Sequence, residues 1–360
     1  MKQRLKLLLA LASTLAMVAC EKANRSFSLL SEKTAFTQSA QYVQKKIDVL
    51  WVVDNSGTME NSQSSLVMNF GAFINRFKTL NYDFHMATTT TDAYKGKFSG
   101  GESETTYRRL RSWGALPKKP VHPFSCEVRT SGVTVMTRDT PNIWDVFLIN
   151  ATQSTCGSGD ERAFASIEDV LSFPGNSDFR RPDAFLAVII VSDEDDFSST
   201  SSTYLSNNYA DPSLIPISHY QQYLDQFAGA GNYSVNAISI MDQLCLNDLN
   251  SGANKEHRMG TRHLELARLT GGVQASICGD FSASLDLISE SIVQLASSFK
   301  IDREPVLESF RVTVDDVIVP NTAVDGWTYE PTTMMVTFHG ASIPHEGAAV
   351  SINYDPVKPK

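Results

Sequence analysis

Two periodicities of apolar residues divide the chain. Between residues 47 and 300, short apolar runs alternate with longer segments in which apolar residues recur every three or four positions. The short runs predict buried strands and the longer segments predict amphipathic helices. This alternation indicates a doubly wound, mostly parallel six-stranded sheet flanked by helices. The predicted strands are Ile47–Val53, 82–87, 133–137, 184–192, 233–240 and 273–277, and the predicted helices are 61–79, 141–149, 162–173, 217–228, 261–269 and 282–299.

The periodicity changes near the end of the chain. In residues 301–360, apolar and polar residues alternate, and Asp-Asp, Asp-Gly, His-Gly and Glu-Gly pairs interrupt the alternation. This pattern predicts a small antiparallel β module. Two polar segments, about 92–132 and 194–215, interrupt the α/β region and are predicted to be insertions that follow strand ends.

Residues 1–20 have the pattern of an export signal. A basic start is followed by an apolar stretch of about 13 residues, shorter than the ~20 that span a bilayer. The stretch ends in Met17-Val18-Ala19-Cys20, which resembles a bacterial lipobox with Cys20 as the acylated residue. The alternative is an ordinary secretory signal. The resemblance predicts a lipid-anchored protein of the bacterial cell envelope. Glu21 follows Cys20, and by resemblance to the sorting pattern of Gram-negative lipoproteins the absence of Asp there favours the outer membrane, on its periplasmic or surface face.

Residues 21–46 are predicted to be a tether, with an edge strand near 36–43. Removing residues 1–20 takes away three basic residues. The 31 Lys and Arg fall to 28 against 40 Asp and Glu, and the formal charge changes from −9 to −12. An acidic chain does not attract nucleic acid, and membrane contact is expected through the N-terminal lipid only.

A group of oxygen-bearing side chains follows the first predicted strand. Asp54, Ser56 and Thr58 occupy alternate positions directly after Ile47–Val53. Ligands of open α/β sheets bind at the carboxyl ends of strands, and hard divalent cations take oxygen ligands. The arrangement resembles the DxSxS signature of the von Willebrand factor A (VWA) domain, whose metal-ion-dependent adhesion site (MIDAS) holds a divalent cation. The order of elements over 47–300 is also similar to that of VWA domains.

The VWA resemblance implies a set of ligands from three loops. Ser56 and Thr58 would bind the cation directly, and Asp54 would hold a metal-bound water. Asp193, at the end of the central strand, matches the acidic residue of the third loop. The expected cation is Mg²⁺, with Mn²⁺ and Ca²⁺ as alternatives. The competing interpretation is that Asp54 or Ser56 only caps the following helix.

The middle loop departs from the family pattern, in which a Thr is usual. Its sequence, Thr155-Cys156-Gly157-Ser158-Gly159, offers Ser158 by position and Thr155 by residue type, and Ser158 is preferred. Glu194, Asp195 and Asp196 follow the third-loop aspartate and are expected to form a solvated acidic rim, although one of them could enlarge the site towards Ca²⁺.

Four cysteines besides Cys20 fit a compartment that permits disulfides. The VWA order of strands and loops implies the pairs Cys126–Cys156 and Cys245–Cys278. His257 and His263 have no Cys neighbours and are expected to be ordinary surface residues rather than zinc ligands.

The VWA resemblance implies metal-dependent adhesion. The leading hypothesis is an envelope-anchored binding protein whose cation takes a carboxylate from a protein or glycan partner. The alternative is a periplasmic structural or assembly scaffold with a weak or vestigial metal site. An enzyme is not predicted: Gly157-Ser158-Gly159 lacks the spacing of a nucleophile elbow, and no catalytic base stands at a recognisable offset.

Overall fold

The computed structural model describes residues 36–41, 45–99, 104–115, 128–205, 208–251, 257–345 and 347–357. The predicted signal peptide, Cys20 and Cys126 lie outside these residues, so the lipid anchor and the Cys126–Cys156 bridge stay predictions. In the described ranges, no helix is long and apolar enough to cross a membrane.

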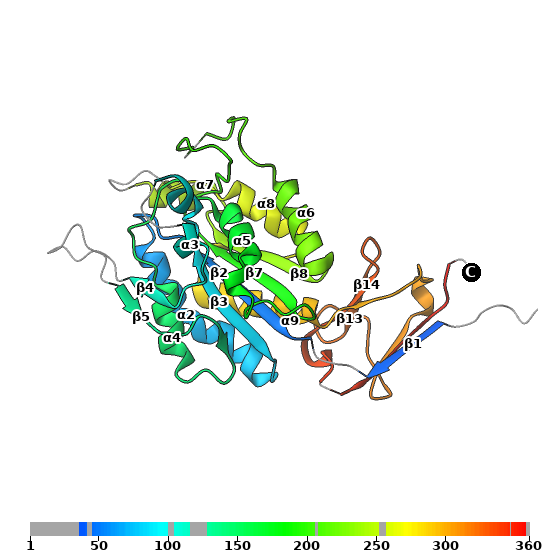
Figure 1. Ribbon diagram of the computed structural model, residues 1–360. Helices are drawn as coiled ribbons and strands as arrows, with labels where there is room; N and C mark the ends of the chain where they lie inside the picture. Colours follow the sequence, from blue (N-terminus) through cyan, green and yellow to red (C-terminus); the bar gives the residue numbers. More distant parts are fainter. Residues whose placement is uncertain are drawn as a thin grey trace, which may run out of the picture.

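A six-stranded sheet forms the centre of the molecule (Figure 1). Its strands pair in parallel, except that the short edge strand β6 runs antiparallel to β3. Both central strands, β2 and β7, are buried along their whole length, as expected for strands that are apolar on both faces. The order across the sheet is β6 (Met136–Thr137), β3 (Phe84–Thr90), β2 (Ile47–Val53), β7 (Phe185–Val191), β8 (Tyr233–Ser239) and β9 (Gln274–Ser276).

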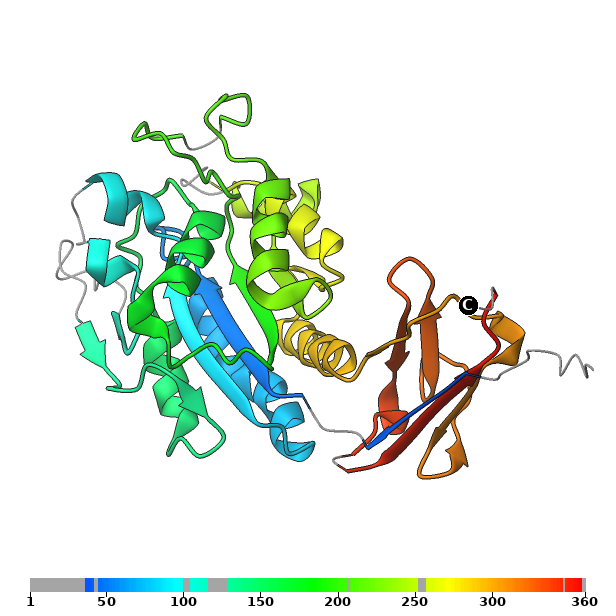
Figure 2. The ribbon, with the colours of Figure 1, turned by 45° about the vertical axis from the view of Figure 1, so that its right-hand side comes forward.

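Helices cover both faces of this sheet (Figures 1 and 2). Alternate residues of β2 belong to different cores: Trp51 packs in one and Leu50 in the other. The Trp51 core is completed by α2 (Glu60–Thr79), α4 (Ile143–Ala151) and α9 (Phe281–Ala296). The Leu50 core is completed by α5 (Ala163–Ser172), α6 (Ile217–Leu224) and α8 (Thr261–Leu269). The predicted mixed α/β fold with a mostly parallel six-stranded sheet is confirmed at this level.

Strand β3 and helix α7 differ from the predicted elements. Strand β3 extends to Thr90 because its threonine run pairs with β2, although hydroxyl residues had suggested that the strand ends at 87. Helix α7 (Gln243–Leu249) was not predicted, and the Asp242 carboxylate caps it by accepting a hydrogen bond from Cys245 N at 2.9 Å. The π-helical turn η3 (Asp225–Gly229) continues α6, and the 3₁₀ turn η2 (Pro174–Asn176) follows α5.

The first insertion contains short elements packed against the α/β region. They are η1 (Lys95–Ser99), α3 (Glu104–Tyr107), β4 (Trp113–Ala115) and β5 (Val128–Thr130), of which β4 and β5 form a two-stranded antiparallel sheet. Gly114 is required here, because a Cβ at this position would lie 1.8 Å from the backbone oxygen of Ile149 in α4.

Separate small antiparallel sheets form a module with its own core beside the α/β region (Figure 2). The expected edge strand near 36–43 is β1 (Phe36–Gln41), which pairs with β15 (Ala349–Tyr354). The module therefore contains strands from both ends of the chain. Its sheets are β1, β15, β11 (Arg311–Val314) and β12 (Val317–Ile318), and β10 (Phe299–Lys300), β14 (Met335–Phe338) and β13 (Trp327–Glu330), with 3₁₀ turns η4 (Leu307–Ser309) and η5 (Gly340–Ser342).

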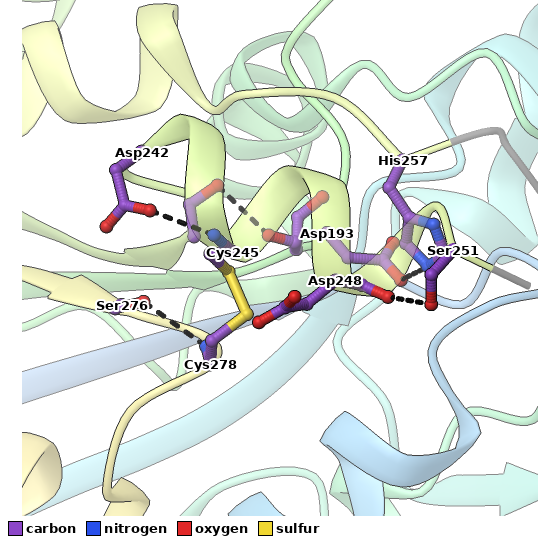
Figure 3. The surroundings of a disulfide bond; sticks show 10 residues. Asp193, Asp242, Cys245, Asp248, Ser251, His257, Ser276 and Cys278 are labelled. Atoms are coloured by element: carbon purple, nitrogen blue, oxygen red, sulfur yellow. Dashed lines mark hydrogen bonds and ion pairs between the residues drawn. A yellow bond between two sulfur atoms is a disulfide. The ribbon is translucent and has the colours of Figure 1, made fainter.

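A disulfide joins Cys245 in α7 to Cys278, which follows β9, with Cα atoms 5.8 Å apart (Figure 3). This predicted pair is present in the structure. Because β8 and β9 are neighbours, the segments that follow them lie within reach of one bridge.

We expect the double substitution Cys245→Ala and Cys278→Ala to lower the free energy of unfolding by about 3–4 kcal/mol. The bridge closes a segment with a sequence separation of 33, which restricts the unfolded chain. Urea unfolding of both proteins measures the difference. Non-reducing peptide mapping identifies the bridges, and a wild-type protein with free thiols at 245 and 278 would contradict this assignment.

Candidate metal centre

Three loops meet at the carboxyl ends of the central strands. The first loop, residues 54–59, follows β2, and the third loop, residues 192–199, follows β7. Asp54 N donates to Val191 O at 3.0 Å, so the two loops begin side by side. The second loop, residues 152–162, precedes α5 and contacts the first loop where Gly157 N donates to Asn55 O at 2.8 Å.

Asp54 is fully buried at the base of the first loop. One of its carboxylate oxygens accepts Ser56 N at 2.7 Å, and the other accepts the hydroxyl of Ser192 at 2.6 Å. Burial, and next the negative charge of Asp193, raise the pKa of Asp54 above its usual value. The carboxylate is therefore fixed in direction, and its charged form would be stabilised by a nearby cation.

Thr58 connects the first loop to the third. Its hydroxyl donates to the Asp193 carboxylate at 3.1 Å, across 135 positions of sequence, and lies 3.4 Å from the hydroxyl of Ser56. The structure thus brings Asp54, Ser56, Thr58 and Asp193 together. Their role as ligands stays a prediction.

His257 supports Asp193 from the other side. Its Nε2 lies 3.3 Å from an Asp193 carboxylate oxygen (Figure 3). Its Nδ1 lies 3.0 Å from Asn250 Oδ1. The expectation of surface histidines is wrong, because His257 is 6% exposed and His263 is fully buried. The sequence gives little signal for these positions, since His257 contacts Asp193 of the third loop and the His263 ring packs against Phe164 of α5.

The second loop is fixed by polar contacts that involve Asp92. The Asp92 carboxylate accepts Ser158 N at 2.8 Å and Asn55 Nδ2 at 2.8 Å. Gly157 allows this close approach, because a Cβ there would lie 2.5 Å from Asn55 Oδ1. The Ser158 hydroxyl accepts Asp160 N at 3.0 Å. Within the described ranges, no hydrogen bond joins the hydroxyl of Ser158 or Thr155 to the first or third loop.

The acidic residues after Asp193 are buried, so the expectation of a solvated rim is wrong. Glu194 is 2% exposed, and Asp195 and Asp196 are fully buried. Asp195 accepts Arg262 N at the start of α8, and Asp196 accepts Phe164 N at the start of α5. Carboxylates are stabilised at helix N-termini, where backbone N–H groups lack partners within the helix.

Gln63 is a buried connector that the sequence did not reveal. From α2, its side-chain amide donates to Asp54 O at 2.8 Å and to Ser154 O at 2.9 Å, and its carbonyl oxygen accepts Gln153 N at 3.0 Å. These three bonds hold the first and second loops in place. A glutamine on an amphipathic helix is ordinarily assigned to the solvent face, so the pattern gave no signal.

The donor chemistry at the three loops fits a hard cation. Carboxylate and hydroxyl oxygens converge there, and the buried hydroxyls of Thr89 and Thr91 and both carboxylate oxygens of Glu161 have no hydrogen-bond partner. Such oxygens are the preferred ligands of Mg²⁺ and Ca²⁺. Across the described residues, no group of three or more His, Cys, Asp or Glu side chains is arranged to hold a metal, so a cation here would depend on hydroxyl ligands as well.

No protein-family model matches this chain, and a search of curated proteins gives no match. Among solved structures, the pilus adhesin SpaC from Lactobacillus rhamnosus GG in its open conformation is similar at 10% identity and a TM-score of 0.41. That match covers 88% of this chain and 40% of SpaC.

Proximal thread matrix protein 1 from the mussel byssus, with a zinc-occupied MIDAS motif, is similar at 12% identity and a TM-score of 0.36. The match covers 73% of this chain and 51% of that protein. The chain thus spans about half or less of the length of these structures, and similarity at this level does not establish a shared function.

We expect Gln63→Ala to lower the free energy of unfolding by about 2 kcal/mol or more, because it leaves buried backbone groups of the first and second loops without partners. Ser64→Ala is the matched control, since Ser64 is the exposed neighbour of Gln63 on α2. Urea unfolding compares the two variants. Equal effects would show that Gln63 does not hold the loops.

Proposed function

We propose that the three loops bind a divalent cation and that the bound cation recruits an oxygen donor from a protein or glycan partner. The contact between Thr58 and Asp193 is the observation that supports this proposal most directly. It brings the hydroxyl ligands expected in the first loop to the carboxylate expected in the third. The VWA resemblance supplies the functional class, metal-dependent adhesion.

The chemistry of the ligands defines the cation and the partner. Ser56 and Thr58 would contribute neutral hydroxyls, while Asp54 and Asp193 would contribute negative charge. Mg²⁺ is the proposed cation, with Mn²⁺ or Ca²⁺ as alternatives, because each accepts oxygen ligands and keeps positions for water or an external group. A partner carboxylate at such a position is what the resemblance predicts.

The proposed location is the bacterial cell envelope, with lipid on Cys20 as the membrane contact. The sequence before Cys20 supports this proposal through its basic start, short apolar stretch and lipobox-like end. Several acyl chains on one cysteine would hold the protein firmly, whereas a single chain gives only marginal binding.

We expect Mg²⁺ to raise the melting temperature of the wild-type protein and Asp54→Ala to remove this effect. At a cation concentration 100 times the dissociation constant, binding adds about 2.7 kcal/mol of stability, or about 5–10 °C for a domain of this size. Thermal melting in EDTA and in millimolar Mg²⁺, Mn²⁺ or Ca²⁺ measures the shift.

The control for this experiment is Asp316→Asn, which removes an exposed carboxylate in the small β module. It should respond to cations as the wild type does. A wild-type melting temperature that no cation changes would refute the metal site. Affinity capture from envelope extract then tests the partner, with wild type and Asp54→Ala each used in Mg²⁺ and in EDTA. A partner retained equally by both proteins in both conditions would favour the scaffold.

We expect the expressed full-length protein to partition into the detergent phase, and Cys20→Ser to move it into the aqueous phase, because the substitution removes the acylated thiol. Phase partition with mass spectrometry of the N-terminal peptide measures this. Cys245→Ser is the control, since it removes a thiol that forms a disulfide. An unmodified wild-type N-terminal peptide would indicate an ordinary secretory signal.

A further inference from the structure

The Cys245–Cys278 disulfide has one exposed and one buried residue. Cys278 lies on the exposed surface after β9, whereas Cys245 in α7 is 4% exposed. Exposed disulfides are reduced more easily than buried ones, because a thiolate must reach one of the two sulfur atoms. The residue that a reductant can reach is therefore Cys278.

Helix α7 depends on this disulfide for its place in the fold. Of its seven residues, all of which the structure describes, only Cys245 is buried. Leu246 and Leu249 pack against the Trp51 core but are only partly buried. Isolated helices shorter than about 12–15 residues are marginal in water, so α7 is stable only where it is attached. The disulfide is its main attachment to the core.

The end of α7 holds His257. Asn250 is the residue that ends the helix, and its side-chain Nδ2 donates to His257 O at 3.3 Å. Its Oδ1 lies 3.0 Å from His257 Nδ1. One side chain at the end of α7 thus contacts both the backbone and the ring of His257.

His257 in turn contacts the third loop. Its Nε2 lies 3.3 Å from one carboxylate oxygen of Asp193, and the other oxygen accepts the hydroxyl of Thr58 at 3.1 Å. Figure 3 shows this contact in the same neighbourhood as the disulfide. His257 and Asp193 are both buried, and polar contacts are stronger in the protein interior than in water. The Asp193 carboxylate is therefore held between His257 and Thr58.

We propose that His257 is a positioning residue for the Asp193 carboxylate, and that the Cys245–Cys278 disulfide is a redox-sensitive link that keeps His257 in place. Reduction would release α7, displace Asn250 and remove the contact between His257 and Asp193. The third loop would then become looser at the candidate metal centre. The expected loss of cation affinity rests on the proposed function, whereas the change in the third loop does not.

The reductant is a dithiol, and the exchange is balanced by its two electrons. A thiolate of the dithiol attacks the sulfur of Cys278, the S–S bond breaks, and Cys245 leaves as a thiolate that takes up a proton. The second thiol of the reductant then attacks the mixed disulfide and releases Cys278. The dithiol becomes a disulfide, and the protein gains two thiols.

Amide hydrogen exchange of the full chain, followed by mass spectrometry, tests the link without a cation. It compares oxidised wild type, wild type reduced with dithiothreitol, and the double variant Cys245→Ser and Cys278→Ser. We expect faster exchange in α7 and in the third loop, residues 192–199, after either change. Exchange in β2 and β7 should not change, because both strands are buried along their whole length.

Two controls accompany the exchange experiment. Leu244→Ala alters a residue of α7 that is 72% exposed, and should exchange as the wild type does. Dithiothreitol added to the double variant should leave the third loop unchanged, which separates this disulfide from any other that the reductant opens. If the double variant does not fold, reduction of the folded wild type gives the same comparison.

Titration calorimetry with Mg²⁺ measures the consequence for the cation. Loss of a residue that orients a metal ligand typically costs ~10–100-fold in metal affinity, so we expect about a tenfold loss on reduction and for His257→Ala. His257→Gln keeps a polar group that can donate to Asp193, and its loss should be smaller. A role of His257 in packing alone would make the two substitutions equal.

Asn250→Ala tests the path between the disulfide and His257. It removes the link while the disulfide stays intact, so third-loop exchange and Mg²⁺ affinity should change as they do on reduction. In protein without the disulfide, Asn250→Ala should add little, because both changes remove the same contact. Effects that add in full would show that the disulfide and Asn250 act independently, which would refute the proposed path.

The outcomes separate this inference from the proposed function. Third-loop exchange that stays slow while α7 exchanges faster would refute the redox-sensitive link, whatever the cation does. Wild-type protein that does not bind Mg²⁺, Mn²⁺ or Ca²⁺ would refute the proposed cation site, and the exchange result would still decide the link. Faster third-loop exchange with unchanged Mg²⁺ affinity would refute the role of His257 as a positioning residue for a cation ligand.

Discussion

The parallel pairing of β2 with β7 is the constraint on which the candidate site depends. It places Val53 beside Val191, so the residues that follow both strands emerge at one edge of the sheet. Asp54 and Asp193 are therefore held close together whether or not their charges favour it. Apolar packing on both faces of these strands supplies the free energy that keeps two carboxylates near each other.

Buried carboxylates at this edge fall into two groups with different roles. Asp195 and Asp196 accept backbone N–H groups at the N-termini of α8 and α5, and Arg262 pairs with Asp196. These groups are satisfied by the protein and fix the helices to the third loop. Asp54 instead lies in the first loop, where burial and the negative charge of Asp193 raise its pKa. The structure thus combines a rigid frame of paired acids with Asp54 and Asp193, which belong to the first and third loops and lie next to the Ser56 and Thr58 hydroxyls.

The sequence predicted those residues of the site that directly follow a strand. Asp54, Ser56, Thr58 and Asp193 follow strongly apolar strands, and strand ends in a parallel sheet share an edge, so their meeting could be inferred. Gln63, His257 and Glu161 could not be inferred in this way, because their burial depends on loops that are distant in sequence. A polar residue on an amphipathic helix or in a Gly-rich loop normally faces water, and only the packed structure shows otherwise.

The fold was predicted on the same basis. The predicted bounds of long periodic segments agree with the structure: those of α2 to within one residue, and those of α8 at both ends. The predicted strand 82–87 begins and ends before β3 (Phe84–Thr90), because a run of threonines is typical of a loop and only pairing with β2 makes it a strand. Helix α7 is short and begins at a side-chain cap, so its apolar periodicity was too brief to detect.

The number of carboxylates around the cation bears on the kind of partner it would accept. Two ionised carboxylates, Asp54 and Asp193, would neutralise a divalent cation, and an approaching carboxylate would meet a site without net charge. Asp92 accepts Ser158 N of the second loop, so a further negative charge lies beside that loop. Hydroxyl oxygens of a glycan would bind the same cation without adding charge, so the ionisation of Asp54 and Asp193 bears on which class of partner the site accepts.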